Sequence, residues 1–480
     1  YIEGKDYVFA DKVIMAYKTW APGRIKHRKV PKGYHARISF DQNSYLVRSE
    51  DDKIYRVIQP EYAEIEKYVY HKCKEAGFIG EVIVDSWIRE DVPGFEGKLL
   101  IEHRYIPTIS FCYEWTNRMY EDYVLWYLEL IKKLTLQNLG MCDIHALNAT
   151  FYQGRFLLVD FGAVSGSITS PRQLVNLMEY VILPFFLKMR GLEGVAHKYL
   201  EDGNEKLSLR EVKGILSEAE YHELCNLYEQ IVFSETKEDV LDFIHNMKKY
   251  MRVFHLDEFE PTSWTDYQDS EWEKSDNPAA WSPKMLNAAR LLQSISPQKV
   301  VDVAGNQGWY GCLCQDSAES ISVIDLSEGG LDKLYQRIKG KNIRNVIPVK
   351  MSICAPSLGR HIDGFVDGLT VQALRDTGIA RYRGDLAIAL ALVHHLVFRE
   401  LLLFEEIIAM LSAYTTKHLL VEFVQIDDRY ITDFEKDGFE WYTKGAFEEA
   451  LRQEFEVIET APSSPPETRT LYLCKKLSSL

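Results

Sequence analysis

The sequence predicts two folded parts of different class, an α+β part followed by an α/β part with a parallel sheet. Before residue 255, short strand patterns and one helix precede a run of helical patterns, which is an α+β order. After residue 283, apolar segments alternate with helical ones, and the first two end in acidic residues. The chain has 480 residues, more than one ordinary core organises, so at least two domains are expected.

The composition is typical of a soluble globular protein. Hydrophobic residues make up 46%, and the net charge of -15 argues against broad binding to nucleic acid or anionic membranes. No apolar run approaches the roughly 18 residues of a membrane span. No signal peptide is visible, although the chain starts at Tyr1, which leaves a trimmed leader open. We therefore expect a cytoplasmic protein, or one bound peripherally to the inner face of a membrane.

The eight cysteines show no CxxC pair, which indicates free thiols in a reducing compartment. Cys312 and Cys314 fall in a predicted helix, where packing is favoured over metal binding.

A β-rich segment comes first and suits a small lobe of about residues 1–106, joined to a helical lobe of about 107–255. Its two clearest strands are separated by turn-forming acidic residues, which predicts a hairpin. The expected elements are strands at 44–48, 53–58, 79–87 and 99–105, a helix at 61–76, and further helices at 119–138, 173–189, 209–216 and 239–252.

Polar residues with a distinctive spacing follow the long helix. Asp143 precedes Asn148 by five positions, and Asp160-Phe161-Gly162 follows a predicted hairpin. This order resembles the catalytic loop and metal segment of protein-kinase-like phosphotransferases, the aminoglycoside and choline kinases above all. The resemblance implies that Asp143 orients or deprotonates an acceptor hydroxyl, while Asn148 and Asp160 hold the Mg²⁺ that bridges the phosphates of ATP. The alternative is that both aspartates cap turns in a helical domain.

The kinase pattern has departures. No glycine-rich loop precedes the hairpin, and Arg56 occupies the strand position that usually offers a lysine to the phosphates. Arg56 can pair with Glu64 or Glu66 on the next helix, with different geometry. An active kinase and a kinase-shaped binding module are both compatible with this pattern.

Residues 256–282 form a connector that is acidic and rich in Ser, Trp and Pro. Its bulky aromatic residues are not typical of a flexible linker, so we expect it to lie across a domain surface and to close over a nucleotide pocket. These aromatic residues are Trp264, Tyr267, Trp272 and Trp281.

A nucleotide site is predicted where two apolar strands end in carboxylates. The first ends at Asp302 and breaks into a glycine-containing turn, and the second ends at Asp325. The layout of residues 283–480 resembles the class I S-adenosylmethionine-dependent methyltransferases, which have a Rossmann-like fold. The resemblance implies that Asp302 and the turn contact the methionyl part of the cofactor and that Asp325 binds the ribose. The implied cofactor contacts are Asp302, Ala304, Gly305, Asn306, Gly308, Asp325, Leu326 and Ser352.

A dehydrogenase is the rival assignment, but the turn does not fit G-x-G-x-x-G. Ala304 and Asn306 stand where the methyltransferase family commonly has glycine, and Met351-Ser352 replaces an acid often found near the adenine. The strands expected in this part are 300–303, 321–326, 345–350, 385–390, 418–424, 455–460 and 470–474, the last two as a hairpin.

Residues 385–396 resemble the fourth-strand motif of the same family, which passes beside the sulfonium and the acceptor. His394 or His395 is then the candidate base, with Glu422 in reserve. If the acceptor were a phosphate, Arg429 or Arg469 could bind its charge; the alternative is that both are solvated.

The whole order also resembles bacterial two-part methyltransferases with an often degenerate kinase-like half. Bifunctional kinase/methyltransferases that cap O-antigen chains carry the same activities in the opposite order. On this analogy we expect methylation of a saccharide or another hydroxylated or phosphorylated acceptor, with ATP used by the first half. The alternatives are a first half that only binds, and a scaffold whose two sites are both vestigial.

Overall fold

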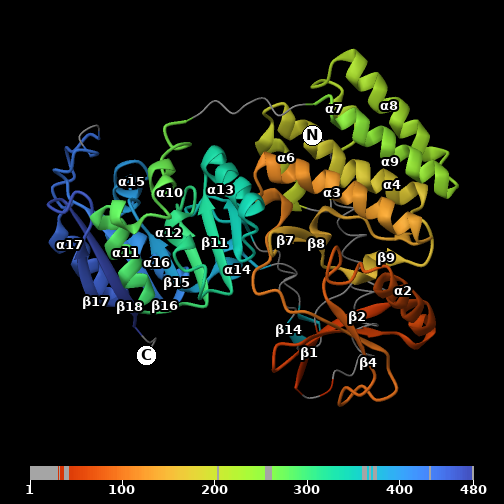
Figure 1. The fold of residues 1–480 in the computed structure, drawn as a ribbon, viewed down its shortest axis with the longest axis horizontal. Coiled ribbons are helices and arrows are strands. Elements are labelled where there is room, and N and C mark those ends of the chain that lie inside the picture. The colour runs from red at the N-terminus through yellow and green to blue at the C-terminus, as the bar shows by residue number, and fades with distance from the viewer. Residues whose placement is uncertain are drawn as a thin grey trace. The chain divides into compact units, whose positions relative to one another are not determined.

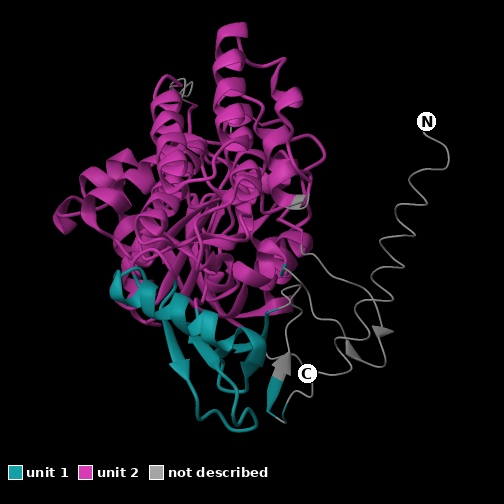
Figure 2. Ribbon diagram, turned by 90° about the vertical axis from the view of Figure 1, so that its right-hand side faces the viewer, with its two compact units in different colours: residues 1–80, 84–105, 359–376 teal, residues 81–83, 106–358, 377–480 magenta. Residues whose placement is uncertain are grey.

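The computed structural model forms two compact units, which Figure 2 distinguishes by colour. Unit 1 comprises residues 1–80, 84–105 and 359–376, and unit 2 comprises residues 81–83, 106–358 and 377–480. Within them, the structure describes residues 31, 33–36, 43–202, 205–254, 262–358, 365–366, 369–370, 376–431 and 434–477. Residues 37–42, part of the segment without a glycine-rich loop, and 256–261 of the connector lie outside the described residues.

Unit 1 contains a five-stranded antiparallel sheet in the order β1-β2-β3-β5-β4. The hairpin of β2 and β3 and the following helix α2 are where the sequence predicts them. The strand expected at 79–87 begins only at Ser86, because Gly80 has a φ of +82° and turns the chain. The elements are β1 Tyr34–Ala36, β2 Ser44–Ser49, β3 Ile54–Ile58, α2 Ala63–Glu75, β4 Ser86–Arg89, β5 Leu100–His103, β13 Phe365–Val366 and β14 Leu369–Thr370.

The first part of unit 2 is helical and is built around α3 (Asn117–Leu136). The buried tyrosines of α3 form part of the core of this helical part. The helix predicted at 173–189 is split into α4, a π-helical turn at Met178–Ile182 and α5, because Pro184 lacks a backbone N–H. The other elements are β6 Gly140–Met141, β7 Ala149–Tyr152, β8 Arg155–Leu158, β9 Val164–Ser165, α4 Pro171–Leu177, α5 Leu183–Met189, α6 Glu193–Asp202, α7 Leu209–Val212, α8 Glu218–Val232 and α9 Lys237–Met251.

The second part of unit 2 is a seven-stranded sheet in the order β12-β11-β10-β15-β16-β18-β17 (Figure 1). Its first five strands are parallel, and β18 runs antiparallel to both of its neighbours. This extends the 3-2-1-4-5 order of a Rossmann-like sheet by a hairpin, which confirms the predicted α/β class. The strands are β10 Lys299–Val303, β11 Ser320–Asp325, β12 Val346–Lys350, β15 Gly384–Ala389, β16 Thr415–Val424, β17 Phe455–Pro462 and β18 Arg469–Lys476.

Helices cover this sheet, and the central strands β10 and β11 are buried almost throughout. Because both faces of these strands are covered, a ligand can approach the sheet only at the strand ends. We expect it at the carboxyl ends of β10 and β11. The helices are α10 Asp269–Glu273, α11 Pro283–Gln293, α12 Trp309–Cys312, α13 Glu328–Lys341, α14 Gly378–Tyr382, α15 Val393–Phe398, α16 Phe404–Ala413 and α17 Lys444–Glu454. Among the described residues, no helix has the length and apolar character that crossing a membrane requires.

Candidate cofactor and acceptor site

The turn after β10 coils through three left-handed residues. Ala304, Asn306 and Gly308 have φ angles of 54°, 51° and 70°. Side chains disfavour this conformation, so glycine suits all three positions. Ala304 and Asn306 are not glycine but still hold the conformation that glycine permits.

Asp302 lies beneath this turn at the end of β10. Its side chain is 3% exposed, and its Oδ2 accepts a hydrogen bond of 2.9 Å from the Gly311 N–H. A Cβ added to Gly305 would lie 2.6 Å from the Asp302 Cγ, so the turn approaches the carboxyl closely. Burial raises the pKa of Asp302 to about 7.

We expect Asp302→Asn to stabilise the protein at pH 8 by about 2 kcal/mol. The folded pKa lies above the ordinary value of 3.8, so ionising Asp302 costs stability as the pH rises from 4 to 7. The asparagine oxygen can still accept from Gly311. Thermal unfolding of both proteins between pH 5 and 8 checks this, and the difference should shrink toward pH 5. A constant difference across that range would contradict the buried carboxyl as its cause.

Asp325 joins the second strand end to the turn. Its Oδ2 accepts from the Asn306 N–H at 2.8 Å, and its Oδ1 accepts from the Ser327 N–H at 2.7 Å. Burial raises its pKa. Leu326 beside it is 64% exposed, although it is large and apolar. Ser352 follows β12, the neighbouring strand, and its hydroxyl accepts from the Ala355 N–H at 3.3 Å.

The connector binds the same turn through hydrogen bonds. The Asn306 amide donates to the Trp264 carbonyl at 2.8 Å, and the Gln307 amide donates to the Thr265 carbonyl at 3.0 Å. The Gln268 side chain accepts from the Trp309 N–H at 3.1 Å. Sequence reasoning found the connector through its aromatic residues but missed Gln268 and Gln307, which no spacing distinguishes from solvated glutamines.

His394 and His395 lie at the start of α15, directly after β15. Their ring centroids are 4.2 Å apart, and the His395 ring packs edge to face on Trp264 at 5.2 Å. Burial, and then His395 and Arg469, lower the pKa of His394 to about 3. Burial, and then Arg399 and Arg469, lower the pKa of His395 to about 4. Both rings are therefore neutral at pH 7 and are weak proton acceptors.

Glu422 and Arg469, two further candidates, form ion pairs that the sequence did not indicate. Glu422 accepts from the Lys284 ammonium at 2.7 Å and from the Ala391 N–H at 2.8 Å. Burial disfavours its charge, but Lys284 outweighs burial and lowers the pKa of Glu422, which makes it a poor base. Arg469 donates twice to Asp428, at 2.8 and 2.9 Å, so its charge is already balanced. Arg429 is exposed, and its guanidinium donates to the Tyr430 hydroxyl at 3.0 Å.

The residues predicted for phosphoryl transfer lie in the helical part. Asn148 donates to the Asp143 carbonyl at 3.1 Å, and Asp160 caps the turn Phe161–Ala163 by accepting from the Gly162 N–H at 3.0 Å. Arg56 belongs to unit 1, where it is buried on β3 and donates to the Ser44 hydroxyl at 2.7 Å. Across the described ranges, three or more His, Cys, Asp or Glu side chains do not gather in an arrangement suited to a metal ion.

Within unit 2, the helical part bonds directly to the strand ends of the sheet. The Asn117 N–H donates to Glu328, which follows β11, at 2.5 Å. Lys350, the last residue of β12, pairs with Glu193 at 2.6 Å and also with Glu328. The edge that carries Asp325 and Ser352 is therefore supported by α3 and α6.

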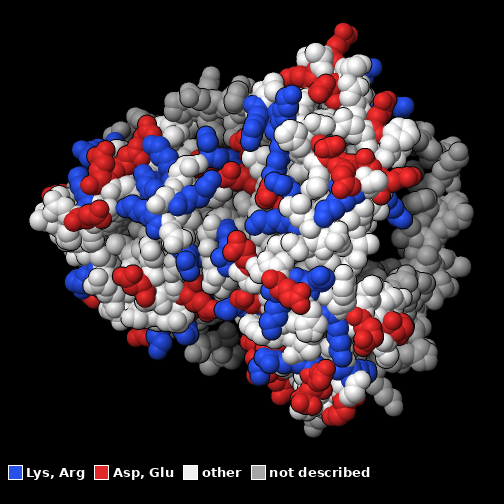
Figure 3. Space-filling model, turned by 45° about the vertical axis from the view of Figure 1, so that its right-hand side comes forward, with Lys and Arg blue, Asp and Glu red and all other residues white. Residues whose placement is uncertain are grey.

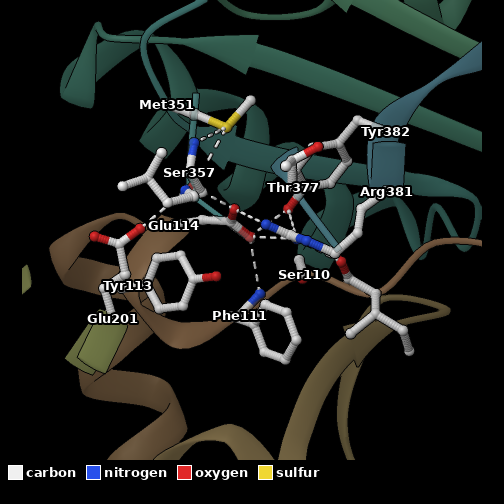
Figure 4. Close-up of polar contacts among 12 residues, drawn as sticks. Ser110, Phe111, Tyr113, Glu114, Glu201, Met351, Ser357, Thr377, Arg381 and Tyr382 are labelled. Atoms are coloured by element: carbon white, nitrogen blue, oxygen red, sulfur yellow. Dashed lines mark hydrogen bonds and ion pairs between the residues drawn. The ribbon is translucent and has the colours of Figure 1, made fainter. Parts of the chain in front are cut away.

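Glu114 forms the most buried of these contacts (Figure 4). Its carboxylate pairs with the guanidinium of Arg381 and accepts from the Tyr382 hydroxyl at 2.5 Å and the Ser357 hydroxyl at 2.7 Å. The Phe111 N–H completes the set at 3.0 Å. Burial disfavours a charged Glu114, but Arg381 outweighs burial and lowers the pKa of Glu114. The sequence did not indicate this ion pair, because its members lie 267 positions apart.

No protein-family model matches the chain. The nodulation protein NoeA of Rhizobium meliloti is 21% identical over 411 residues, which is 79% of this chain and 82% of NoeA. The N-methyltransferase NodS of Bradyrhizobium japonicum aligns with a TM-score of 0.30 at 12% identity, covering 44% of this chain and 99% of NodS. The magnesium protoporphyrin IX methyltransferase of Synechocystis, solved with bound S-adenosylhomocysteine, aligns with a TM-score of 0.30 at 13% identity. The alignment covers 48% of this chain and 94% of that methyltransferase.

Proposed function

We propose that the α/β part of unit 2 is an S-adenosylmethionine-dependent methyltransferase acting on a hydroxylated or phosphorylated acceptor such as a saccharide. One observation carries the proposal. A tight left-handed turn and two carboxylates, the buried Asp302 and the partly exposed Asp325, meet at the carboxyl ends of adjacent parallel strands. A Rossmann-like sheet binds nucleosides at this place.

The residues at the turn suit the parts of the cofactor. Asp325 keeps lone pairs for the ribose hydroxyls while its backbone bonds fix its orientation. Leu326 offers an exposed apolar surface to the adenine, and Ser352 lies on the neighbouring strand end. Asp302 and the turn hold the methionyl end. When bound, S-adenosylmethionine supplies a methyl group on a sulfonium, and the chain aligns the acceptor with it.

The surface supports a small-molecule or glycan acceptor over a nucleic acid. Figure 3 shows Lys and Arg side chains interspersed with Asp and Glu side chains on the face in view. With a net charge of -15, the chain lacks the electrostatic excess that binds a phosphate backbone.

Calorimetry tests the proposal. We expect S-adenosylmethionine to bind at one site per chain and Asp325→Asn to weaken it by about tenfold to a hundredfold, since the ribose loses a charged acceptor. Asp316→Asn, at an exposed position two residues after Cys314, is the matched control and should bind normally. Binding of a nicotinamide dinucleotide in place of S-adenosylmethionine, or no heat with either, would end the methyltransferase assignment.

A second candidate function is phosphoryl transfer by a kinase-like N-terminal part, domain 1–255, before the connector at 256–282. The bond between Asn148 and Asp143 and the position of Asp160 after the β7–β8 hairpin favour it. Asp143 would orient the acceptor, and Asn148 and Asp160 would hold Mg²⁺. If calorimetry shows that magnesium-ATP binds, and Asp160→Asn abolishes this binding, the result supports a nucleotide site. Methyl transfer unaffected by Asp160→Asn would favour a non-catalytic module.

A further inference from the structure

We propose that the methyl acceptor is an uncharged saccharide, recognised by Trp264 and Tyr267 of the connector together with the His394–His395 pair. This inference rests on the proposed methyltransferase function and specifies its acceptor. The surface formed by these four side chains is called the acceptor face below.

The buried charges beside the acceptor face are paired, while Arg399, the exposed cation near His395, lies over the Phe434 ring. Lys284 and Glu422 form one buried ion pair at 2.7 Å, and Arg469 and Asp428 form another at 2.8 Å. A phosphate or carboxylate acceptor would need a cation without a partner, and a protonated amine would need a free carboxylate. Neither ion pair can give up a partner without leaving a buried charge unbalanced. The two buried ion pairs are therefore closed to a charged acceptor, which favours an uncharged one.

Neutral polar atoms of and beside the acceptor face have no hydrogen-bond partner among the residues that the structure describes. The Nδ1 atoms of His394 and His395 and the hydroxyl of Tyr310 are buried without a hydrogen bond. His394 and Tyr310 are only 3% and 4% exposed. Leaving such groups unsatisfied is costly, so a bound ligand that supplies hydroxyl groups is a natural complement.

Aromatic surface lies next to these atoms. The rings of Trp264 and Tyr267 are 5.3 Å apart, and Trp264 also contacts the His395 ring. Tyr267 is 43% exposed, and Trp264 is half-buried. A saccharide ring combines an apolar C–H face with hydroxyls at its rim, which matches aromatic rings beside neutral hydrogen-bonding groups. The connector thus contributes to the acceptor face as well as to the turn.

The proton balance of the reaction fits weakly basic histidines. The acceptor hydroxyl oxygen forms the new bond to the methyl carbon while the carbon–sulfur bond breaks, and its electron pair stays on sulfur as a neutral thioether. As the methyl group is added, the hydroxyl proton on this oxygen becomes strongly acidic. Even a weakly basic, neutral imidazole Nδ1 can then accept the proton and pass it to water. No other reactant is required.

Trp264→Ala is the decisive variant, because it removes the ring but keeps the backbone carbonyl that accepts from Asn306. We expect the KM for a neutral oligosaccharide to rise about tenfold, the value for one lost aromatic contact, with S-adenosylmethionine affinity unchanged. Tyr68→Ala, which removes an exposed ring from α2, is the control and should change neither quantity.

Transfer of labelled methyl groups is measured with neutral oligosaccharides, the same oligosaccharides bearing a phosphate or uronic acid, and simple amines. Labelling of the neutral set, with KM raised by Trp264→Ala, supports the inference. Labelling restricted to charged acceptors or amines overturns it, as does the absence of transfer to every neutral saccharide while S-adenosylmethionine still binds. Loss of S-adenosylmethionine binding itself would instead remove the proposed function.

Discussion

Replacing Glu114 by glutamine should lower the free energy of unfolding by about 3–5 kcal/mol, the usual cost of breaking a buried ion pair from one side. Glu114 is 0% exposed, and its charge balances Arg381 while it accepts from Tyr382 and Ser357. Glutamine keeps the shape but leaves the guanidinium buried without a counter-charge. Urea unfolding measured by fluorescence and by far-UV circular dichroism checks the loss.

Two further variants separate charge from packing. Glu114→Leu combined with Arg381→Leu removes both charges, so it should cost clearly less than Glu114→Gln alone. Glu201→Gln, whose carboxylate accepts from the Leu358 N–H near the same contact, keeps a side-chain oxygen and should cost less than about 1 kcal/mol. If Glu114→Gln proved as mild as Glu201→Gln, the ion pair would not stabilise unit 2.

The second large effect is expected at Gly305. A Cβ there would lie 2.6 Å from the Asp302 Cγ and 2.9 Å from the Val323 Cγ1, and both atoms belong to buried strand residues. Gly305→Ala should therefore cost about 1–3 kcal/mol of stability, as overpacked cores do. Because the turn must shift, S-adenosylmethionine affinity should fall at least about tenfold, measured by calorimetry on the folded variant.

Gly340→Ala is the matched control for this glycine. Gly340 lies in α13, and an added Cβ meets nothing within 4 Å. Alanine is the better helix former, so this variant should gain up to about 1 kcal/mol. Equal behaviour of the two variants would contradict a close approach between the turn and Asp302.

Local patterns were enough to predict most of the sheet. The strand ends at Asp302 and Asp325 follow from apolar runs that close on a carboxylate, and such runs are typical of buried parallel strands. The strand expected at 79–87 was placed too early and begins only at Ser86, because the left-handed residue Gly80 turns the chain before it.

Contacts between distant segments could not be predicted. Glu422 looked like a spare base because Lys284, its partner, lies 138 positions away and resembles any solvated lysine at a helix start. The low basicity of the two histidines has this origin in part, since burial and the distant Arg469 lower both pKa values, whereas Arg399, which also acts on His395, is only four residues away. A sequence shows which residues carry chemistry, whereas their neighbours decide the charge state.

The bond between Glu114 and Arg381 has a consequence for how this chain can change over evolution. Each half constrains the other, because an altered carboxylate is tolerated only if a residue 267 positions later changes with it. If recombination replaced the sheet with one from another gene, Glu114 would be left buried without the positive charge of Arg381. The two segments should therefore be inherited together.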